Sequence, residues 1–336
     1  MNIKIMKNRF LSSALCLLVC VLLFKNAPGY SSVEQGGDIP NVIIITLSGV
    51  RNAESIADPE HQYMPHLWGD MLKEGMLYTD VVCADQQFHI PTFNAVNTGQ
   101  KFPLWYDVKT PTIFQYVRKK YSWPAHKFWM IGHWQNSGTF YETNEYEDAN
   151  SDFISLKLEV SQELESKLSK QELLLLKSMR EDAKRFSGFS FAIWDTFEEL
   201  FYRLFKKVVL AFHPKLVHYV MGGPETAHYD SFIRYALSLK RNDEMIYEIW
   251  KMIQDDPFYK DNTFLMVSPN IARDGYYRSH NNNPYDDPSH TWLYVFGPGV
   301  EKGVTVRRPV FHVDIFPTVA RIMNVKVPPG DGKALF

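Results

Sequence analysis

Side chains that can bind metals or donate protons stand beside four predicted strands, at the points where a parallel sheet binds its ligands. Ser48 follows the apolar run NVIIITL, and Glu225 and His228 lie in GGPETAH, just after LVHYVM. Asn270 follows NTFLMVSP, and His290 directly precedes TWLYVF. Carboxylates and imidazoles are ligands for zinc or manganese, whereas serine and asparagine offer only neutral oxygens. The carboxylate and imidazole side chains together favour a metal site. Taken one at a time, each residue could instead simply be hydrogen-bonded at the edge of a sheet.

The elements that must position these residues alternate along the chain from residue 40 onward. Strands are predicted at 42–47, 76–83, 127–132, 216–222, 262–269 and 291–299. Helices are predicted at 64–74, after Thr110-Pro111, at 230–254 and at 313–323. The alternation predicts a mostly parallel sheet with helices on both faces, a three-layer α/β/α sandwich.

Size and charge narrow the class of protein. With 336 residues, of which 45% are apolar and 15% aromatic, the chain is expected to form one large domain or one domain with an insertion. The net charge of −2 argues against a nucleic-acid partner, because phosphate backbones require a basic face. Of the three cysteines, only Cys83 lies beyond the first thirty residues, so no intramolecular disulfide is expected.

Residues 1–30 have the form of a signal peptide. Three basic residues precede an apolar run at residues 10–24, which is short for a spanning helix of about 20 residues. We therefore predict export to the periplasm or the extracellular space. The alternative is an N-terminal anchor formed by residues 10–24, which would tether the protein to a membrane, because no clean small-x-small cleavage site follows.

Residues 144–213 are predicted to be a helical insertion between two core strands, forming a cap near the ligand face. The segment is rich in helix formers and its apolar residues recur at helical spacing. Its last helix is aromatic on one side, with Lys206 and Lys207 near its end. Packing on the sheet is the favoured interpretation, and binding to a membrane surface is the alternative.

Seven blocks, in order from residue 41 to the C-terminus, resemble the alkaline phosphatase superfamily, which includes sulfatases and nucleotide phosphodiesterases. The blocks are the opening strand with SGVR, PHLWGDMLKEGMLYTDVV, HIPTFNAVNTG, ETAH, NTFLMVSPNIARDG, HTWLYVFGPGVEKG and HVDIFPTVARIMNV. The resemblance implies an alkaline phosphatase-like α/β domain at residues 40–336. It also implies a pair of divalent ions ~4 Å apart that clamp the attacking and leaving oxygens of a phosphate or sulfate ester.

The resemblance assigns ligand roles unevenly to this chain. For one ion, it implies the ligands Glu225, His228 and His290, which suit zinc or manganese. The positions of the second ion are degenerate, because the usual Asp, Asp and His are replaced by Ser48, Asn270 and Ile271. At most one divalent metal ion is therefore expected. A plain turn role for Ser48 is the simpler alternative.

The same resemblance places His89 at the position of the nucleophile, two residues before Pro91 and nine before Thr98. A histidine cannot act as the usual alkoxide, and it could instead be a hydrogen-bonded core residue. Thr92 is the alternative nucleophile. It lies three residues away, however, and a hydroxyl needs a base or metal beside it.

Three hypotheses follow for the function. The favoured one is a catalytically impaired relative, or pseudoenzyme, that binds a small anionic ligand such as a phosphate or sulfate ester. The second is a one-metal hydrolase of such esters that uses Glu225, His228 and His290. The third is a membrane-tethered interaction partner whose helical insertion carries the function.

Overall fold

The computed structural model describes residues 38–83, 89–101, 110–132, 152–154, 194–228, 230–280 and 287–336, with isolated positions between 166 and 181. The predicted signal peptide or anchor at residues 1–30 lies outside these residues, as does most of the predicted insertion at 144–213. Among the helices described, none is both long and apolar enough to cross a membrane.

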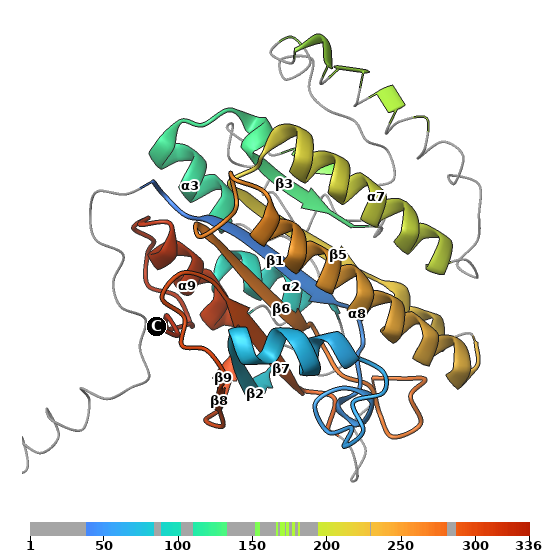
Figure 1. Ribbon diagram of the computed structural model, residues 1–336. Helices are drawn as coiled ribbons and strands as arrows, with labels where there is room; N and C mark the ends of the chain where they lie inside the picture. Colours follow the sequence, from blue (N-terminus) through green and yellow to red (C-terminus); the bar gives the residue numbers. More distant parts are fainter. Residues whose placement is uncertain are drawn as a thin grey trace, which may run out of the picture.

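The strands of the described residues form one sheet in which most neighbouring pairs are parallel (Figure 1). The strands are β1 (Asn41–Leu47), β2 (Met76–Val82), β3 (Phe128–Ile131), β4 (Asp152–Ile154), β5 (Leu216–Met221), β6 (Thr263–Pro269), β7 (His290–Phe296), β8 (Val304–Val306) and β9 (Val310–Phe311). Their order is β4-β3-β5-β1-β6-β7-β2-β8, and β9 pairs with β2. Strand β7 runs antiparallel to both of its neighbours.

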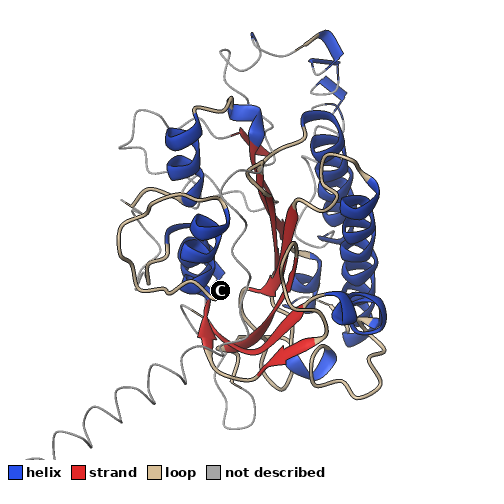
Figure 2. Cartoon of the chain, turned by 60° about the vertical axis from the view of Figure 1, so that its left-hand side comes forward, coloured by secondary structure: helices blue, strands red, loops and turns tan. Residues whose placement is uncertain are grey.

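Helices cover both faces of the sheet (Figure 2). Helices α7 (Trp194–Phe212) and α8 (Phe232–Asp255) pack on one face. Helices α2 (His89–Thr98), α3 (Ile113–Tyr121) and α9 (Ile315–Ile322) pack on the other. The expected three-layer α/β/α arrangement with a mostly parallel sheet is confirmed.

The residues of β1 alternate between the two hydrophobic cores. Ile43, Ile45 and Leu47 join the core under α7 and α8, while Val42 and Ile44 join the core under α2, α3 and α9. Every residue of β1 is buried. Burial on both faces explains why this strand is a continuous apolar run instead of an alternating one.

Two predicted helices differ in detail from those observed. The segment predicted as a helix at 64–74 is wound as a π-helix at Leu67–Met71 and a 3-10 helix at Leu72–Glu74. The α8 carboxylate of Asp243 accepts the backbone N–H groups of His66 and Leu67, which fixes this entry. Helix α3 is capped by Thr112 rather than by Thr110-Pro111, because Thr112 and Gln115 form a reciprocal capping box.

The described part of the predicted insertion contains a strand as well as a helix. Strand β4 pairs with β3 at the edge of the sheet. The apolar face of α7, which includes Phe201, Leu204 and Phe205, is buried on the sheet. Packing of this helix on its own sheet accounts for its aromatic side. The boundaries of the insertion, and its role as a cap, stay predictions.

Candidate metal centre

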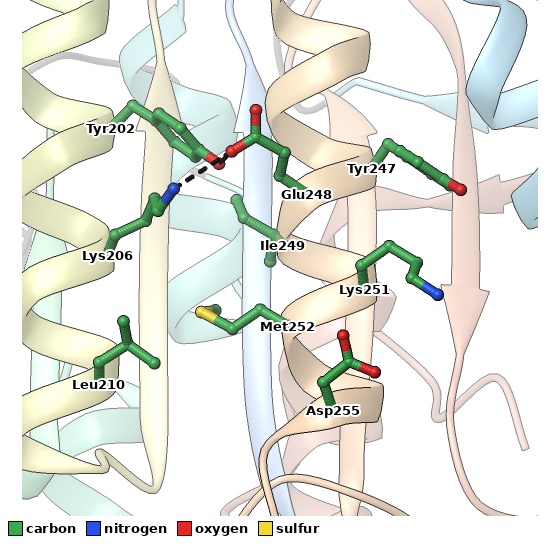
Figure 3. A pocket seen from close by; sticks show the side chains of 9 residues that line it. All are labelled: Tyr202, Lys206, Leu210, Tyr247, Glu248, Ile249, Lys251, Met252 and Asp255. Atoms are coloured by element: carbon green, nitrogen blue, oxygen red, sulfur yellow. Dashed lines mark hydrogen bonds and ion pairs between the residues drawn. The ribbon is translucent and has the colours of Figure 1, made fainter.

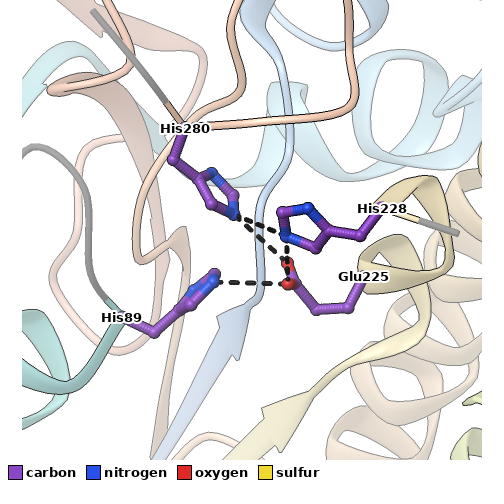
Figure 4. A group of neighbouring side chains, drawn as sticks. All are labelled: His89, Glu225, His228 and His280. Atoms are coloured by element: carbon purple, nitrogen blue, oxygen red, sulfur yellow. Dashed lines mark hydrogen bonds and ion pairs between the residues drawn. The ribbon is translucent and has the colours of Figure 1, made fainter. Parts of the chain in front are cut away.

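Four side chains converge at the carboxyl ends of β1, β5 and β6 (Figure 4). They are His89, Glu225, His228 and His280, and their candidate ligand atoms all lie within 4.8 Å of one another. His89 begins α2, Glu225 and His228 follow β5, and His280 lies in the loop after β6. No other group of three or more His, Cys, Asp or Glu residues suited to a metal occurs among the described residues.

The loop that carries Glu225 and His228 is held by a residue of α7. These two residues lie in the 3-10 segment Gly223–His228, directly after β5. The carboxylate of Glu198 accepts the backbone N–H groups of Gly222 at 2.5 Å and Gly223 at 2.7 Å. It also accepts the hydroxyl of Tyr219 at 2.8 Å. Burial raises the pKa of Glu198 to about 7, although these three hydrogen bonds oppose the shift.

Three distances within the group are close to the edges of a metal tetrahedron, and a fourth, from Glu225 Oε1 to His280 Nε2, is longer at 3.8 Å. Glu225 Oε2 lies 3.0 Å from His228 Nε2 and 3.3 Å from His89 Nε2. His228 Nε2 lies 3.2 Å from His280 Nε2. Ligands bound at about 2.0 Å from one tetrahedral zinc ion lie roughly 3.3 Å apart, so this donor set fits such an ion.

In His280 and His89, the hydrogen bond made by one ring nitrogen determines whether the other ring nitrogen donates or accepts. His280 Nδ1 lies 2.7 Å from the carbonyl of Ala272 and must donate to it, which leaves Nε2 as an acceptor facing the group. Burial lowers the pKa of His280 to about 4, so the imidazole is neutral near pH 7, as metal binding requires.

In His89 the two ring nitrogens have the opposite roles, with Nδ1 as the acceptor. The Asn270 carboxamide donates from Nδ2 to His89 Nδ1 at 2.8 Å, while its Oδ1 accepts the backbone N–H of Gly49. With Nδ1 accepting from Asn270, the proton of His89 lies on Nε2, which is 3.3 Å from Glu225 Oε2. We infer that Glu225, His228 and His280 are the ligand set that fits best, with His89 orienting the carboxylate. Three protein ligands and one open position are typical of catalytic zinc.

Glu225 is ionised despite its burial. Burial alone would raise the pKa of its carboxyl, but the nearby His89 and Arg273 and the contacts with His228 and His280 hold it well below the usual range. Arg273 Nη2 donates to Glu225 Oε1 at 2.7 Å. The other oxygen, Oε2, faces His89 and His228.

His290 does not join Glu225 and His228. Its Nδ1 lies 2.6 Å from Asp80 Oδ1 on β2, its Nε2 lies 3.7 Å from Asp287 Oδ2, and its side chain is 45% exposed. His280 takes the place in the group that the sequence assigned to His290. The sequence alone does not point to His280 or Arg273, because both lie in an irregular loop without periodicity.

The three residues expected at the degenerate second site are all fully buried. The Ser48 hydroxyl has no hydrogen-bond partner among the residues that the structure describes. The carboxamide of Asn270 is hydrogen-bonded to His89 and to the backbone of Gly49, and the side chain of Ile271 has no atom that could bind a metal.

Thr92 is also buried, one turn along α2 from His89. Its Oγ1 has no hydrogen-bond partner within the described part of the chain. No described base is thus bonded to this hydroxyl to activate it.

A separate hollow of about 300 Å³ lies on the outer helical layer, between α7 and α8 (Figure 3). Three of its polar side chains are bonded together, since Glu248 accepts hydrogen bonds from Tyr202 at 2.5 Å and Lys206 at 3.2 Å. It lies away from the carboxyl ends of the strands and brings together no group suited to a metal.

Comparison with known proteins identifies the fold. No family model and no curated protein matches the chain. Among solved structures, the lipoteichoic acid synthase LtaP from Listeria monocytogenes matches with a TM-score of 0.58 and 14% identity, covering 89% of this chain and 77% of that one. The PsFucS1 sulfatase from Pseudoalteromonas sp. matches with a TM-score of 0.58 and 13% identity, over 89% and 74% of the two chains.

The phosphonate monoester hydrolase SpPMH from Silicibacter pomeroyi matches with a TM-score of 0.56 and 17% identity, over 88% of this chain and 76% of that one. A protein in the alkaline phosphatase superfamily from Vibrio parahaemolyticus also matches, with a TM-score of 0.51 and 14% identity, over 89% of this chain and 70% of that one. This chain therefore has the alkaline phosphatase superfamily fold, as its motifs indicated. Because the identities are this low, the similarity establishes the fold and leaves the activity to be argued from the site.

Proposed function

We propose that this chain is an exported alkaline phosphatase-like protein that holds one divalent ion, zinc or manganese, and binds a small phosphate or sulfate ester with little or no hydrolysis. The observation that carries the proposal is the contrast between the two sets of positions. Glu225, His228 and His280 form one compact donor set. The second set offers only the neutral oxygens of Ser48 and Asn270, with Ile271 contributing nothing.

Loss of one ion weakens hydrolysis more than binding. A bound ion would supply positive charge to an oxygen of the ester, whereas displacement at phosphorus or sulfur is aided when a second ion stabilises the other reacting oxygen. The chain also lacks the usual nucleophile, because His89 occupies its position beside Glu225 and Thr92 has no bonded base among the described residues. Binding without efficient turnover is the consequence.

A one-metal hydrolase is the alternative. Partial exposure of His228 favours the one-metal hydrolase, because its side chain is 29% exposed and solvent can reach the group there. The ligands would be Glu225 and His228, with His280 in place of His290. Thr92 or water would then have to act as the attacking group.

Export rests on the signal-like residues 1–30, with the anchor at residues 10–24 as the alternative. Fractionation of cells that express the full chain separates the two: a soluble exported form supports cleavage, and a form that stays with membranes supports the anchor.

Metal content and turnover, measured on the same preparation, test the proposal. We expect one zinc or manganese ion per wild-type chain, no ion in Glu225→Gln, and an unchanged ion in the exposed control Glu301→Gln. Aryl phosphates, phosphodiesters and aryl sulfates should show no efficient turnover with either metal added. Efficient turnover that disappears in Glu225→Gln would favour the one-metal hydrolase, and a wild type that binds no metal would contradict both.

A further inference from the structure

Arg273 is a fully buried cation whose donors are directed at the loops of the candidate metal centre. Its side chain is 0% exposed. Nε donates to the carbonyl of Gly49 at 2.7 Å, and Nη2 donates to the carbonyl of Pro224 at 3.0 Å and to Glu225 Oε1 at 2.7 Å. A guanidinium stays protonated in proteins, so this charge is permanent.

The groups that Arg273 connects come from three adjacent strands. Gly49 follows β1, Pro224 and Glu225 follow β5, and Arg273 itself follows β6; these strands lie in the order β5-β1-β6. Two of the degenerate positions are close in sequence to these contacts: Ser48 directly precedes Gly49, and Asn270 lies three residues before Arg273. Arg273, which follows β6, therefore bonds the loop after β1, and both loops carry positions expected to hold a second cation; it also bonds the loop after β5, which carries ligands of the first ion.

The charges near Arg273 also balance. Two carboxylates that would face a second divalent ion are replaced by the neutral residues Ser48 and Asn270. Glu225 is the one carboxylate bonded to the guanidinium among the described residues, and a buried charge is tolerated only when it is paired. One fixed positive charge is sufficient there, and a second divalent ion beside it would be repelled.

We propose that Arg273 is a built-in replacement for the second divalent ion and fixes the stoichiometry of the centre at one ion per chain. It engages Glu225 Oε1 and leaves Oε2, which faces His228, for the remaining ion; its Nη1 also lies 3.5 Å from His228 Nε2, at the outer limit of a hydrogen bond. This inference rests on the proposed one-ion function and adds the reason why the second ion is excluded.

The test compares Arg273→Met with Arg278→Met, an exposed arginine in the same loop, in the full-length protein. Zinc binding and thermal unfolding are measured for each. Removal of the buried charge should tighten zinc binding about tenfold or more, because a like charge near the ion is lost. It should also lower the unfolding temperature of the metal-free protein and enlarge the shift produced by zinc. Arg278→Met should match the wild type in all three measurements.

The double variant Arg273→Met/Glu225→Gln guards against a simple failure of Arg273→Met to fold. It buries no unpaired charge, so it should regain most of the unfolding temperature lost in the single variant. Failure to regain it would overturn the proposal, as would two zinc ions in the wild type or unchanged zinc affinity in Arg273→Met. If the wild type binds no zinc, the proposed function fails and this inference fails with it, whereas unchanged zinc affinity in Arg273→Met beside a wild type that binds one ion overturns this inference alone.

Discussion

His290 Nδ1 lies 2.6 Å from Asp80 Oδ1 on β2, and His290 is not part of the group around Glu225. Strand β7 is antiparallel to β6, so its first residue does reach the edge of the sheet where the metal centre lies. Position at the edge is therefore not enough to place a side chain in the centre.

Zinc affinity should separate the two histidines. We expect His280→Ala to lower the affinity by more than about 100-fold, since loss of an outer-shell partner alone costs ~10–100-fold. His290→Ala should leave the affinity unchanged, because its ring is bonded to Asp80. Competition titration with a chromophoric chelator measures both values. An equal loss in the two variants would show that His290 reaches the ion after all.

The pH dependence of stability should reveal Glu198. Its pKa is raised by burial from the ordinary 4.5 to about 7 in the folded chain. The stabilisation gained from this shift is complete below about pH 4.5 and is lost as the pH rises through about 7. Relative to Glu198→Gln, the wild type should therefore lose on the order of 3 kcal/mol of unfolding free energy between about pH 4.5 and pH 8.

Urea unfolding at several pH values measures this difference, and Glu301→Gln, which removes an exposed carboxyl, serves as the control. If wild type and Glu198→Gln lose stability in parallel as the pH rises, Glu198 is not the titrating group. Because Glu198 holds the backbone of Gly222 and Gly223, replacement by leucine should be more harmful than replacement by glutamine at every pH.

Most of the fold could be predicted because its strongest signals are local. The runs that form β1, β5 and β6 are buried on both faces and are consequently apolar at nearly every position. The winding of residues 64–74 could not be predicted, because it depends on Asp243, which lies more than 170 residues away. Long-range contacts override local propensity there.

The candidate site could be predicted only where chain order fixes position. Glu225 and His228 directly follow a central strand, so their place at its carboxyl end follows from the topology. His280 and Arg273 occupy a loop whose path is set by contacts such as that between His280 and the Ala272 carbonyl. No spacing in the sequence reports such contacts.

Gly49 should be irreplaceable for two separable reasons. Its φ of +70° disfavours side chains, and an added Cβ would meet Glu225 Oε1, Arg273 Nη2 at 2.7 Å and His280 Cε1 at 2.9 Å. Gly303, with a φ of +68° and only the Lys73 carbonyl oxygen 3.8 Å from an added Cβ, is the control for the backbone effect. Gly303→Ala should cost about 1–2 kcal/mol of unfolding free energy and leave zinc binding intact. Gly49→Ala should cost more and also weaken zinc binding.

The same pair of variants distinguishes backbone strain at a positive φ from steric contact between the added methyl group and the metal centre. Chemical denaturation gives the stability of each, and zinc titration gives the affinity. Equal losses of stability in Gly49→Ala and Gly303→Ala, with zinc affinity retained in both, would mean that the centre has room for a methyl group beside Glu225, Arg273 and His280.

Thr92→Val tests whether the alternative nucleophile has any function. The Thr92 hydroxyl is buried without a hydrogen-bond partner in the described residues, so an isosteric methyl group should be tolerated or should raise the unfolding free energy by up to about 1 kcal/mol. Any residual hydrolysis of aryl esters should be unchanged, because an unactivated hydroxyl does not attack. Denaturation curves and ester assays of the two proteins provide the measurements. A loss of hydrolysis with stability intact would instead identify Thr92 as the attacking group, and the one-metal hydrolase would then replace the binding protein as the better account of this site.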